Sequence, residues 1–170
     1  MKTIDLAFLK NIPLFTDLDE VRLEKIRKIM KEKKVAAGGV IIREGTKGTE
    51  MFILLDGEVE VSKTLLLKVA GQGMDQRDKS LIRLTGNDFA FFGEMTLFDS
   101  NAERSASVIA TSDCVVAEIT QKDFIGLAES DHEIGYHVLK NLIKIISSRL
   151  EKTTKDVLKL TTALSLALER

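Results

Sequence analysis

The spacing of hydrophobic positions changes twice along the 170-residue chain, and each change marks a new kind of element. Over residues 17–34 the apolar positions recur close to every 3.6 residues, which predicts a helix. Thr16 or Asp17 can cap this helix, with acids in its first turn and lysines in its last, as the helix dipole favours. We therefore expect a helical lead over residues 1–32. Its apolar positions are Leu18, Val21, Leu23, Ile26, Ile29 and Met30.

After the helical lead, short runs of β-prone residues alternate with glycine-containing turns. Asp56 and Gly57 suit a hairpin turn that needs positive φ, and the run after them alternates glutamate with valine. A polar loop is expected over residues 70–80, and further strands over 104–110 and 114–119. Many short strands with turns between them predict a β-sandwich or jelly roll.

Near Gln121 the helical pattern returns, and from about residue 131 to residue 168 little breaks it except Gly135. Because helices and strands occupy separate parts of the chain, the fold class is α+β. The expected divisions are the helical lead over 1–32, the β-roll over 33–120 and C-terminal helices over 121–170.

The last predicted helix carries a stripe of residues at spacings of three or four, which approaches a coiled-coil pattern. A helix of about 35 residues would be about 50 Å long, more than a domain of this size can cover. A two-fold homodimer of parallel helices is therefore favoured over a helix packed only on its own β-roll. The stripe consists of Leu139, Leu142, Ile146, Leu150, Thr153, Val157, Leu160 and Leu164.

The charge balance and the single cysteine narrow the classes of protein. Twenty-five basic and 26 acidic residues give a net charge of -1, which argues against a nucleic-acid binder. Cys114 excludes an intrachain disulfide, and its apolar setting predicts an inert thiol in a buried strand. No secretory signal is visible, and the apolar stretch LTTALSLAL is too short to span a bilayer. We expect a cytoplasmic protein with no membrane contact.

The usual signatures of enzymes and metal sites are missing from the sequence. His132 and His137 are five residues apart, so they do not share one helix face as a ligand pair would. The GQG sequence at 71–73 lacks the rest of a dinucleotide or phosphate-loop fingerprint and is expected to be a flexible loop. No nucleophile elbow or acid/base carboxylate pair stands out. The sequence therefore predicts no catalytic residue, no metal and no cofactor.

The stretch FFGEMTLFDSNAERSASV, residues 91–108, offers a different kind of chemistry. Gly93 permits close approach of a ligand, and Glu94 begins a run that can form one helical turn with free amides facing an anion. A strand is expected to start at Arg104, whose planar guanidinium suits bidentate phosphate binding beside the Ser105 hydroxyl. A carboxylate accepts a sugar hydroxyl, so a ribose phosphate fits both ends. An internal Glu94–Arg104 ion pair is the alternative, and the spacing alone leaves both open.

This stretch resembles the phosphate-binding cassette of the cyclic nucleotide-binding domain family. Segments 36–61 and 11–26 are similar to the family's first hairpins and to its N-terminal helical lead, so the resemblance covers about residues 11–151. It implies an eight-stranded antiparallel β-roll (jelly roll) flanked by N-terminal helices and a long C-terminal helix. The matching cassette positions are Phe92, Gly93, Glu94, Leu97, Arg104, Ser105, Ala106 and Val108.

The resemblance also implies roles for individual residues. Glu94 would accept the ribose 2′-hydroxyl, Arg104 would hold the cyclic phosphate and Ser105 would assist. Met95 and Thr96 stand where the family often has leucine and alanine. The choice between cyclic AMP and cyclic GMP as the ligand therefore stays open. The implied ligand-binding set is Gly93, Glu94, Met95, Arg104, Ser105 and Ala106.

The C-terminal region resembles the catabolite activator branch of the family, where hydroxyl residues on the long helix read the base. Thr153 and Thr154 are the possible counterparts, and solvated or register-setting threonines are the alternative. That branch continues into a DNA-binding helix-turn-helix, whereas this sequence ends at Arg170. We expect a sensor that moves its C-terminal helix through a hinge near 121–135 and acts on an unknown downstream protein. A ligand-free scaffold and a truncated transcription regulator are the alternatives.

Overall fold

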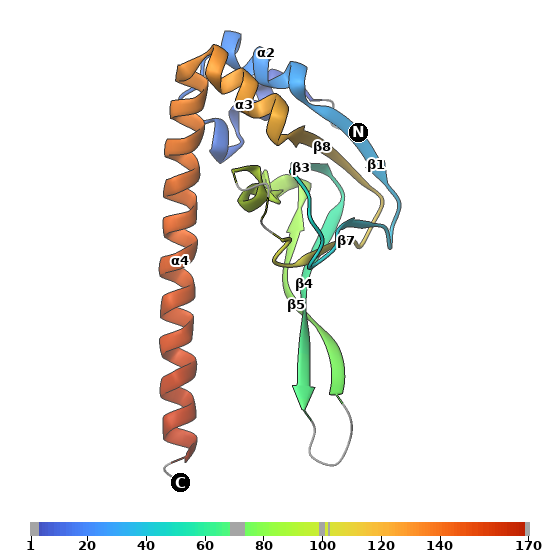
Figure 1. Cartoon of the computed structure of the whole chain (residues 1–170), viewed down its shortest axis with the longest axis vertical. Coiled ribbons are helices and arrows are strands. Elements are labelled where there is room, and N and C mark those ends of the chain that lie inside the picture. The colour runs from blue at the N-terminus through green and yellow to red at the C-terminus, as the bar shows by residue number, and fades with distance from the viewer. Residues whose placement is uncertain (1–3, 69–73, 99–100, 102, 169–170) are drawn as a thin grey trace.

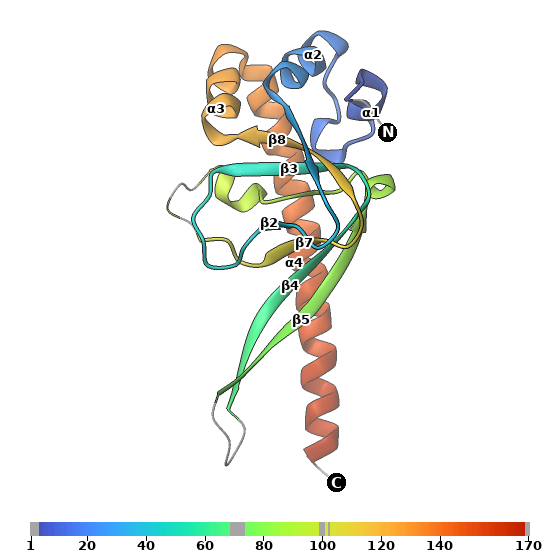
Figure 2. The same cartoon turned by 90° about the vertical axis from the view of Figure 1, so that its right-hand side faces the viewer.

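The computed structural model describes residues 4–68, 74–98, 101 and 103–168. Within them, the strands form two four-stranded antiparallel sheets with the orders β1-β8-β3-β6 and β2-β7-β4-β5 (Figures 1 and 2). The predicted α+β fold with an eight-stranded antiparallel β-roll is confirmed. The strands are β1 Lys31–Val35, β2 Val40–Ile42, β3 Glu50–Asp56, β4 Glu58–Lys68, β5 Met74–Thr85, β6 Phe91–Phe92, β7 Ser107–Ala110 and β8 Cys114–Thr120.

The N-terminal lead is helical, but its main helix is shorter than the sequence pattern predicts. It consists of α1 Leu6–Lys10, the 3-10 turn η1 Pro13–Phe15 and α2 Glu20–Ile29. The cap of α2 is Asp19, whose carboxylate accepts the amide of Arg22, so the expected caps Thr16 and Asp17 are wrong. The lysine-rich run after α2 forms β1 and pairs with β8. Pairing with this buried strand outweighs the helical preference of lysine.

The hairpin of β4 and β5 is longer than expected. Gly57 has φ 88° at the turn into β4, as the Asp56-Gly57 signal predicts. The expected loop at 70–80 is wrong for residues 74–80, which belong to β5 and pair with β4. In the described part of the chain, β4 beyond Ser62 pairs with no strand other than β5, so this ribbon lies outside the pairing with β7. The 71–73 loop lies outside the described residues.

The cassette region contains short turns rather than long strands. The 3-10 turns η2 Gly86–Asp88 and η3 Glu94–Leu97 flank β6, so the predicted helical turn after Gly93 is confirmed. The strand expected from Arg104 starts only at Ser107 as β7. The strand expected over 114–119 is confirmed as β8.

Two buried clusters hold the fold together. One lies between the two sheets and contains Cys114, which is buried as predicted, with its thiol donating to the Glu58 carbonyl at 3.2 Å. The other packs the N-terminal helices, α3 and the start of α4 on the β1-β8-β3-β6 sheet. Strand β8 supplies side chains to both clusters, since Val116 belongs to the first and Ala117 to the second. This double burial explains its nearly continuous apolar run.

The C-terminal part consists of α3 Gln121–Ser130 and the 37-residue α4 His132–Leu168. Both views show α4 and the β4–β5 hairpin extending beyond the sheets on the same side (Figures 1 and 2). Asn141 is buried and donates its amide to the carbonyls of Thr16 at 2.7 Å and Leu14 at 3.3 Å. No helix in the described ranges is both long and apolar enough to cross a membrane.

The exposed apolar stripe on α4 differs from the expected one at two positions, since Ile143 replaces Leu142 and the exposed Tyr136 extends the stripe by one residue. Leu142 is 5% exposed and belongs to the domain core, whereas Ile143 is 64% exposed. Ile143 therefore replaces Leu142 in the stripe, because only an outward side chain is available to a partner helix. We call the exposed stripe the α4 seam. It consists of Tyr136, Leu139, Ile143, Ile146, Leu150, Thr153, Val157, Leu160 and Leu164.

Candidate functional site

Arg104 is the buried cation at the centre of the cassette. Its side chain is 6% exposed, and Nη1 donates to the Thr96 hydroxyl at 2.6 Å and to the Gly93 carbonyl at 3.2 Å. Nη2 forms an ion pair with Oε2 of Glu50 at 3.1 Å. Burial lowers the pKa of the Arg104 guanidinium, and the Glu50 carboxylate opposes that shift. The charge is therefore held in place by β3 and η3 together.

Two glycines make room for this guanidinium. A Cβ at Gly48 would lie 2.5 Å from Nη2 of Arg104, and a Cβ at Gly93 would lie 2.8 Å from Nη1. Gly93 also has φ 79°, which other residues rarely adopt. The sequence predicts that Gly93 allows close approach of a ligand. The structure shows that the missing side chain of Gly93 makes room for the Arg104 guanidinium.

The described hydrogen bonds of Arg104 involve Nη1 and Nη2. Among the described residues, no partner is found for Nε. The Nε–Nη2 edge faces Gly48, since a Cβ there would lie 2.5 Å from Nη2 and 2.8 Å from Nε. Only glycine therefore leaves space beside this edge of the guanidinium.

Glu94 faces the C-terminal helix. Its side chain is 9% exposed, and Oε1 accepts a hydrogen bond from Nη1 of Arg149 on α4 at 2.7 Å. The guanidinium of Arg149 also lies over the Phe91 ring, 5.2 Å from its centroid. No described residue bonds Oε2 of Glu94, so this oxygen can still accept a hydroxyl. Figure 1 shows the yellow-green turn that carries Glu94 lying between α4 and the strands.

The internal Glu94–Arg104 ion pair, the alternative interpretation of the sequence, is wrong. Each side chain has a different partner, Arg149 for Glu94 and Glu50 for Arg104. The acid and the base thus lie in the same cassette without neutralising each other. That arrangement is the one a ligand with both a hydroxyl and a phosphate needs.

The structure places the other predicted residues near the cassette surface or on α4. Met95 is 64% exposed, and the exposed Ser105 hydroxyl lies 3.9 Å from its sulfur. Ala106 is half-buried beside them. Thr153 and Thr154 are exposed on α4, and each donates its hydroxyl to the carbonyl four residues earlier, at 2.9 Å. They lie one turn beyond Arg149, and neither has a described hydrogen bond to the β-roll.

Sequence reasoning missed Glu50, Gly48, Thr96 and Arg149. Glu50 and Gly48 lie within the recognised hairpin segment 36–61, but nothing in the spacing connects them with Arg104, 54 residues away from Glu50. Arg149 is one of many basic residues on an exposed helix. Only the folded chain shows that it reaches the cassette.

Histidines give no sign of a metal site. His137 lies 3.4 Å from the Glu133 carboxylate on the same helix. Among the described residues, no group of three or more histidine, cysteine or acidic side chains is arranged to hold a metal ion.

Comparison with known proteins identifies the family of this chain. The family model of the cyclic nucleotide-binding domain matches residues 32–131. The cAMP-activated global transcriptional regulator Vfr of Pseudomonas aeruginosa is 33% identical over 138 residues, which are 79% of this chain and 58% of Vfr. Isozyme 2, forms cD5/T2, of the Drosophila melanogaster cGMP-dependent protein kinase is 33% identical over 105 residues, 62% of this chain and 10% of the kinase.

A solved structure also has a fold similar to that of this chain. The Thermus thermophilus catabolite activator protein superposes with a TM-score of 0.72 at 25% identity, covering 88% of this chain and 63% of that one. The chain belongs to the cyclic nucleotide-binding domain family and is a regulatory domain of that kind. It spans less than two thirds of the length of each of these three proteins.

Proposed function

We propose that this protein is a cyclic nucleotide sensor that binds cyclic AMP or cyclic GMP between the cassette and α4. In this proposal the guanidinium of Arg104 holds the cyclic phosphate and Oε2 of Glu94 accepts the ribose 2′-hydroxyl. Gly93, Met95, Ser105 and Ala106 complete the walls. The observation that carries the proposal is the separate pairing of Arg104 and Glu94, because the buried base and acid of one cassette do not neutralise each other.

Movement of α4 is the proposed signal. Arg149 joins α4 directly to the carboxylate that would receive the ribose. A ligand that changes the position of Glu94 therefore changes how α4 is held. This shifts the equilibrium only if the ligand binds the two positions of α4 with different affinity. The hinge is expected near residues 121–135, between the β-roll and α4.

The α4 seam supports a parallel homodimer. Its residues are exposed and alternate at spacings of three and four, the a and d pattern of a two-stranded coiled coil. In this proposal residues 1–32 brace the sensor, 33–120 hold the nucleotide, and 121–170 dimerise and transmit the signal to an unknown protein. Thr153 lies in the seam and Thr154 beside it, where they set the register or contact the base. The proposed location is the cytoplasm, with neither DNA nor membrane as a direct partner.

A thermal-shift panel tests nucleotide binding. Cyclic AMP, cyclic GMP and linear 5′-AMP are each added at increasing concentration, and the melting temperature is recorded. A ligand that binds the folded state raises it by mass action, so at least one cyclic nucleotide should shift it with a saturating dose dependence. The linear nucleotide is the control for non-specific effects. A scaffold that has lost its ligand would show no shift with any of the three.

A further inference from the structure

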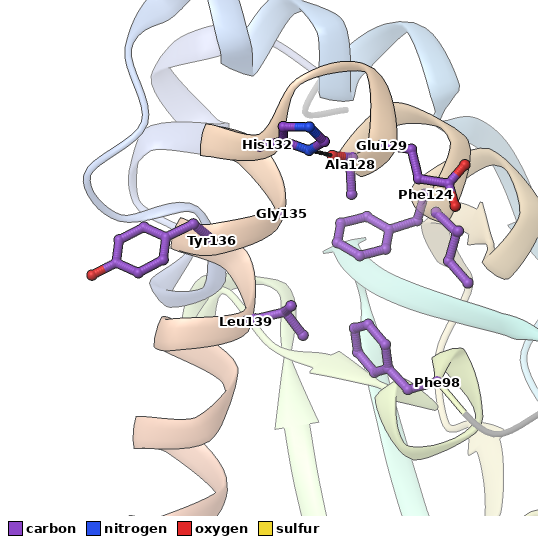
Figure 3. A pocket seen from close by; sticks show the side chains of 9 residues that line it. Phe98, Phe124, Ala128, Glu129, His132, Gly135, Tyr136 and Leu139 are labelled. Atoms are coloured by element: carbon purple, nitrogen blue, oxygen red, sulfur yellow. Dashed lines mark hydrogen bonds between the residues drawn. The ribbon is translucent and has the colours of Figure 1, made fainter.

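An apolar hollow lies where α3, α4 and the end of the cassette meet (Figure 3). Its volume is about 330 Å³. Phe98 and Phe124 lie on one side, with their rings edge to face at a centroid distance of 5.8 Å. Phe98 is the C-cap of η3, so the hollow borders the cassette itself.

The α4 residues that line this hollow coincide with a coiled-coil hole. They are His132, Gly135, Tyr136 and Leu139. In the heptad frame of the α4 seam, Tyr136 occupies an a position and Leu139 a d position, while His132 and Gly135 occupy the preceding d and g positions. In a parallel two-stranded coiled coil, each a side chain inserts into a hole formed by four residues of the facing helix. These four residues form the hole that faces position 136.

We propose that the hollow receives the side chain of Tyr136 from a second copy of this chain. Tyr136 is 61% exposed, and Figure 3 shows it pointing away from the hollow of its own chain. Gly135 lets α3 pack closely against α4 at the edge of the hole, since a Cβ there would lie 3.1 Å from that of Ala128. A two-fold axis along the helices fills both hollows in the same way.

The chemistry of the hollow fits a tyrosine. The ring meets the aromatic pair Phe98 and Phe124, and aromatic contacts favour such tilted arrangements. Glu129 also lines the hollow, so the phenol has an acceptor at the rim. Phe98 and Ile125 are 42% and 37% exposed in the single chain, and this contact would cover them.

The contact would make dimerisation sensitive to the nucleotide. Tyr136 of one copy would touch Phe98 at the end of the cassette of the other, so a cassette that shifts on binding changes the dimer contact. By linkage, dimerisation then changes nucleotide affinity by the same factor. This regulation rests on the proposed sensor function and its α4 dimer.

The sequence contains no tryptophan, which allows a direct optical test. Tyr136→Trp places a single fluorophore at the proposed contact, and Lys144→Trp places one on the outer face of α4 as a matched control. Emission is measured as concentration rises to about 100 µM, a range that covers micromolar association. Sedimentation gives the oligomeric state in parallel. We expect the emission of the Tyr136→Trp protein to shift to the blue as dimers form, while that of the control stays unchanged.

The possible results separate this inference from the proposed function. A dimer in which both fluorophores stay solvent-exposed overturns the Tyr136 contact and leaves the seam dimer standing. A wild-type monomer at the highest concentration overturns the contact and the dimer, while the thermal-shift panel decides nucleotide binding on its own. A blue shift that is independent of concentration shows that the hollow is filled within one chain, and it also overturns the proposal.

Smaller substitutions guard against misfolding of the tryptophan variant. Tyr136→Ala and Phe98→Ala should each weaken dimerisation about tenfold, and the double variant should weaken it little further, because both remove one contact. Independent, multiplying losses would contradict the contact between these two residues.

Discussion

Glu94 of the cassette and Arg149 of α4 form an ion pair of 2.7 Å that joins the ligand-binding turn to the long helix. Phe91 lies beneath the Arg149 guanidinium and restricts its position. The pair holds the Glu94 carboxylate in one orientation while leaving its second oxygen available. In the proposed function, this carboxylate would link ribose recognition to the position of α4.

Replacing Arg149 should weaken nucleotide binding without abolishing it. In Arg149→Gln the Glu94 carboxylate loses its charged partner, and because Arg149 is half exposed we expect a loss of about 1 kcal/mol, or about fivefold in affinity. Lys155→Gln on the same helix is the control, since Lys155 pairs with the exposed Glu151. Equal affinities of the two variants would show that Arg149 does not support the ribose site.

A methyl group at Gly48 should displace Arg104. The Cβ of Gly48→Ala would lie 2.5 Å from Nη2, so the guanidinium must move away from Glu50. We expect nucleotide affinity to fall at least about tenfold, since a charge-assisted contact depends on geometry. Gly126→Ala is the matched control, because nothing lies within 4 Å of a Cβ there. A Gly48→Ala protein with wild-type affinity would contradict the assignment of Arg104 to the phosphate.

Asn141 should stabilise the join between α4 and the N-terminal lead. Its buried amide satisfies the carbonyls of Leu14 and Thr16, and Asn141→Leu would leave both without this donor. We expect the free energy of unfolding to fall by about 2 kcal/mol, measured by urea denaturation. Ser147→Ala, on an exposed part of α4, should change it by less than about 0.5 kcal/mol. Similar values for the two variants would mean that the carbonyls find other partners.

The junction of α3 and α4 should weaken in acid. Asp131 accepts hydrogen bonds from Lys25 at 2.7 Å and Arg22 at 3.3 Å, and these partners, Lys25 first, lower its pKa from 3.8. Because the unfolded chain binds this proton more readily, the contribution is complete above pH 3.8 and is lost as pH falls through the lowered pKa.

The comparison with Asp131→Asn measures this contribution. The difference in unfolding free energy between wild type and variant should be largest near neutral pH and should shrink as the pH falls below about 4. A difference that stays constant from neutral to strongly acidic pH would show that the charge of Asp131 is not what stabilises the junction.

The spacing of apolar residues predicted those elements whose burial follows from their own local sequence pattern. Strand β8 and helix α4 were predicted within a residue or two, since apolar runs and helical spacing are local signals. The prediction of a helix through residue 34 was wrong, because the lysine run forms β1 and pairs with β8, about 80 residues away in the sequence. The loop predicted over the first part of β5 was wrong, because its polar residues resemble a loop unless the pairing with β4 is known.

In the candidate site, too, the sequence predicted the residues with a local signal and not those that depend on tertiary folding. Gly93, Glu94 and Arg104 were identified because they lie within one short stretch whose order is characteristic of a family. Glu50 and Arg149 were not, because each reaches the cassette from a distant element, and tertiary folding alone decides which carboxylate pairs with which arginine.

The central claim is that Arg104 and Glu94 bind a cyclic nucleotide. Calorimetric titration of wild type and Arg104→Ala with cyclic AMP and cyclic GMP tests it most directly, with circular dichroism confirming that the variant is folded. We predict one site per chain for at least one nucleotide, and at least about a hundredfold loss in the variant, about 2.7 kcal/mol. No heat of binding at millimolar nucleotide, or equal affinity in both proteins, would contradict the account.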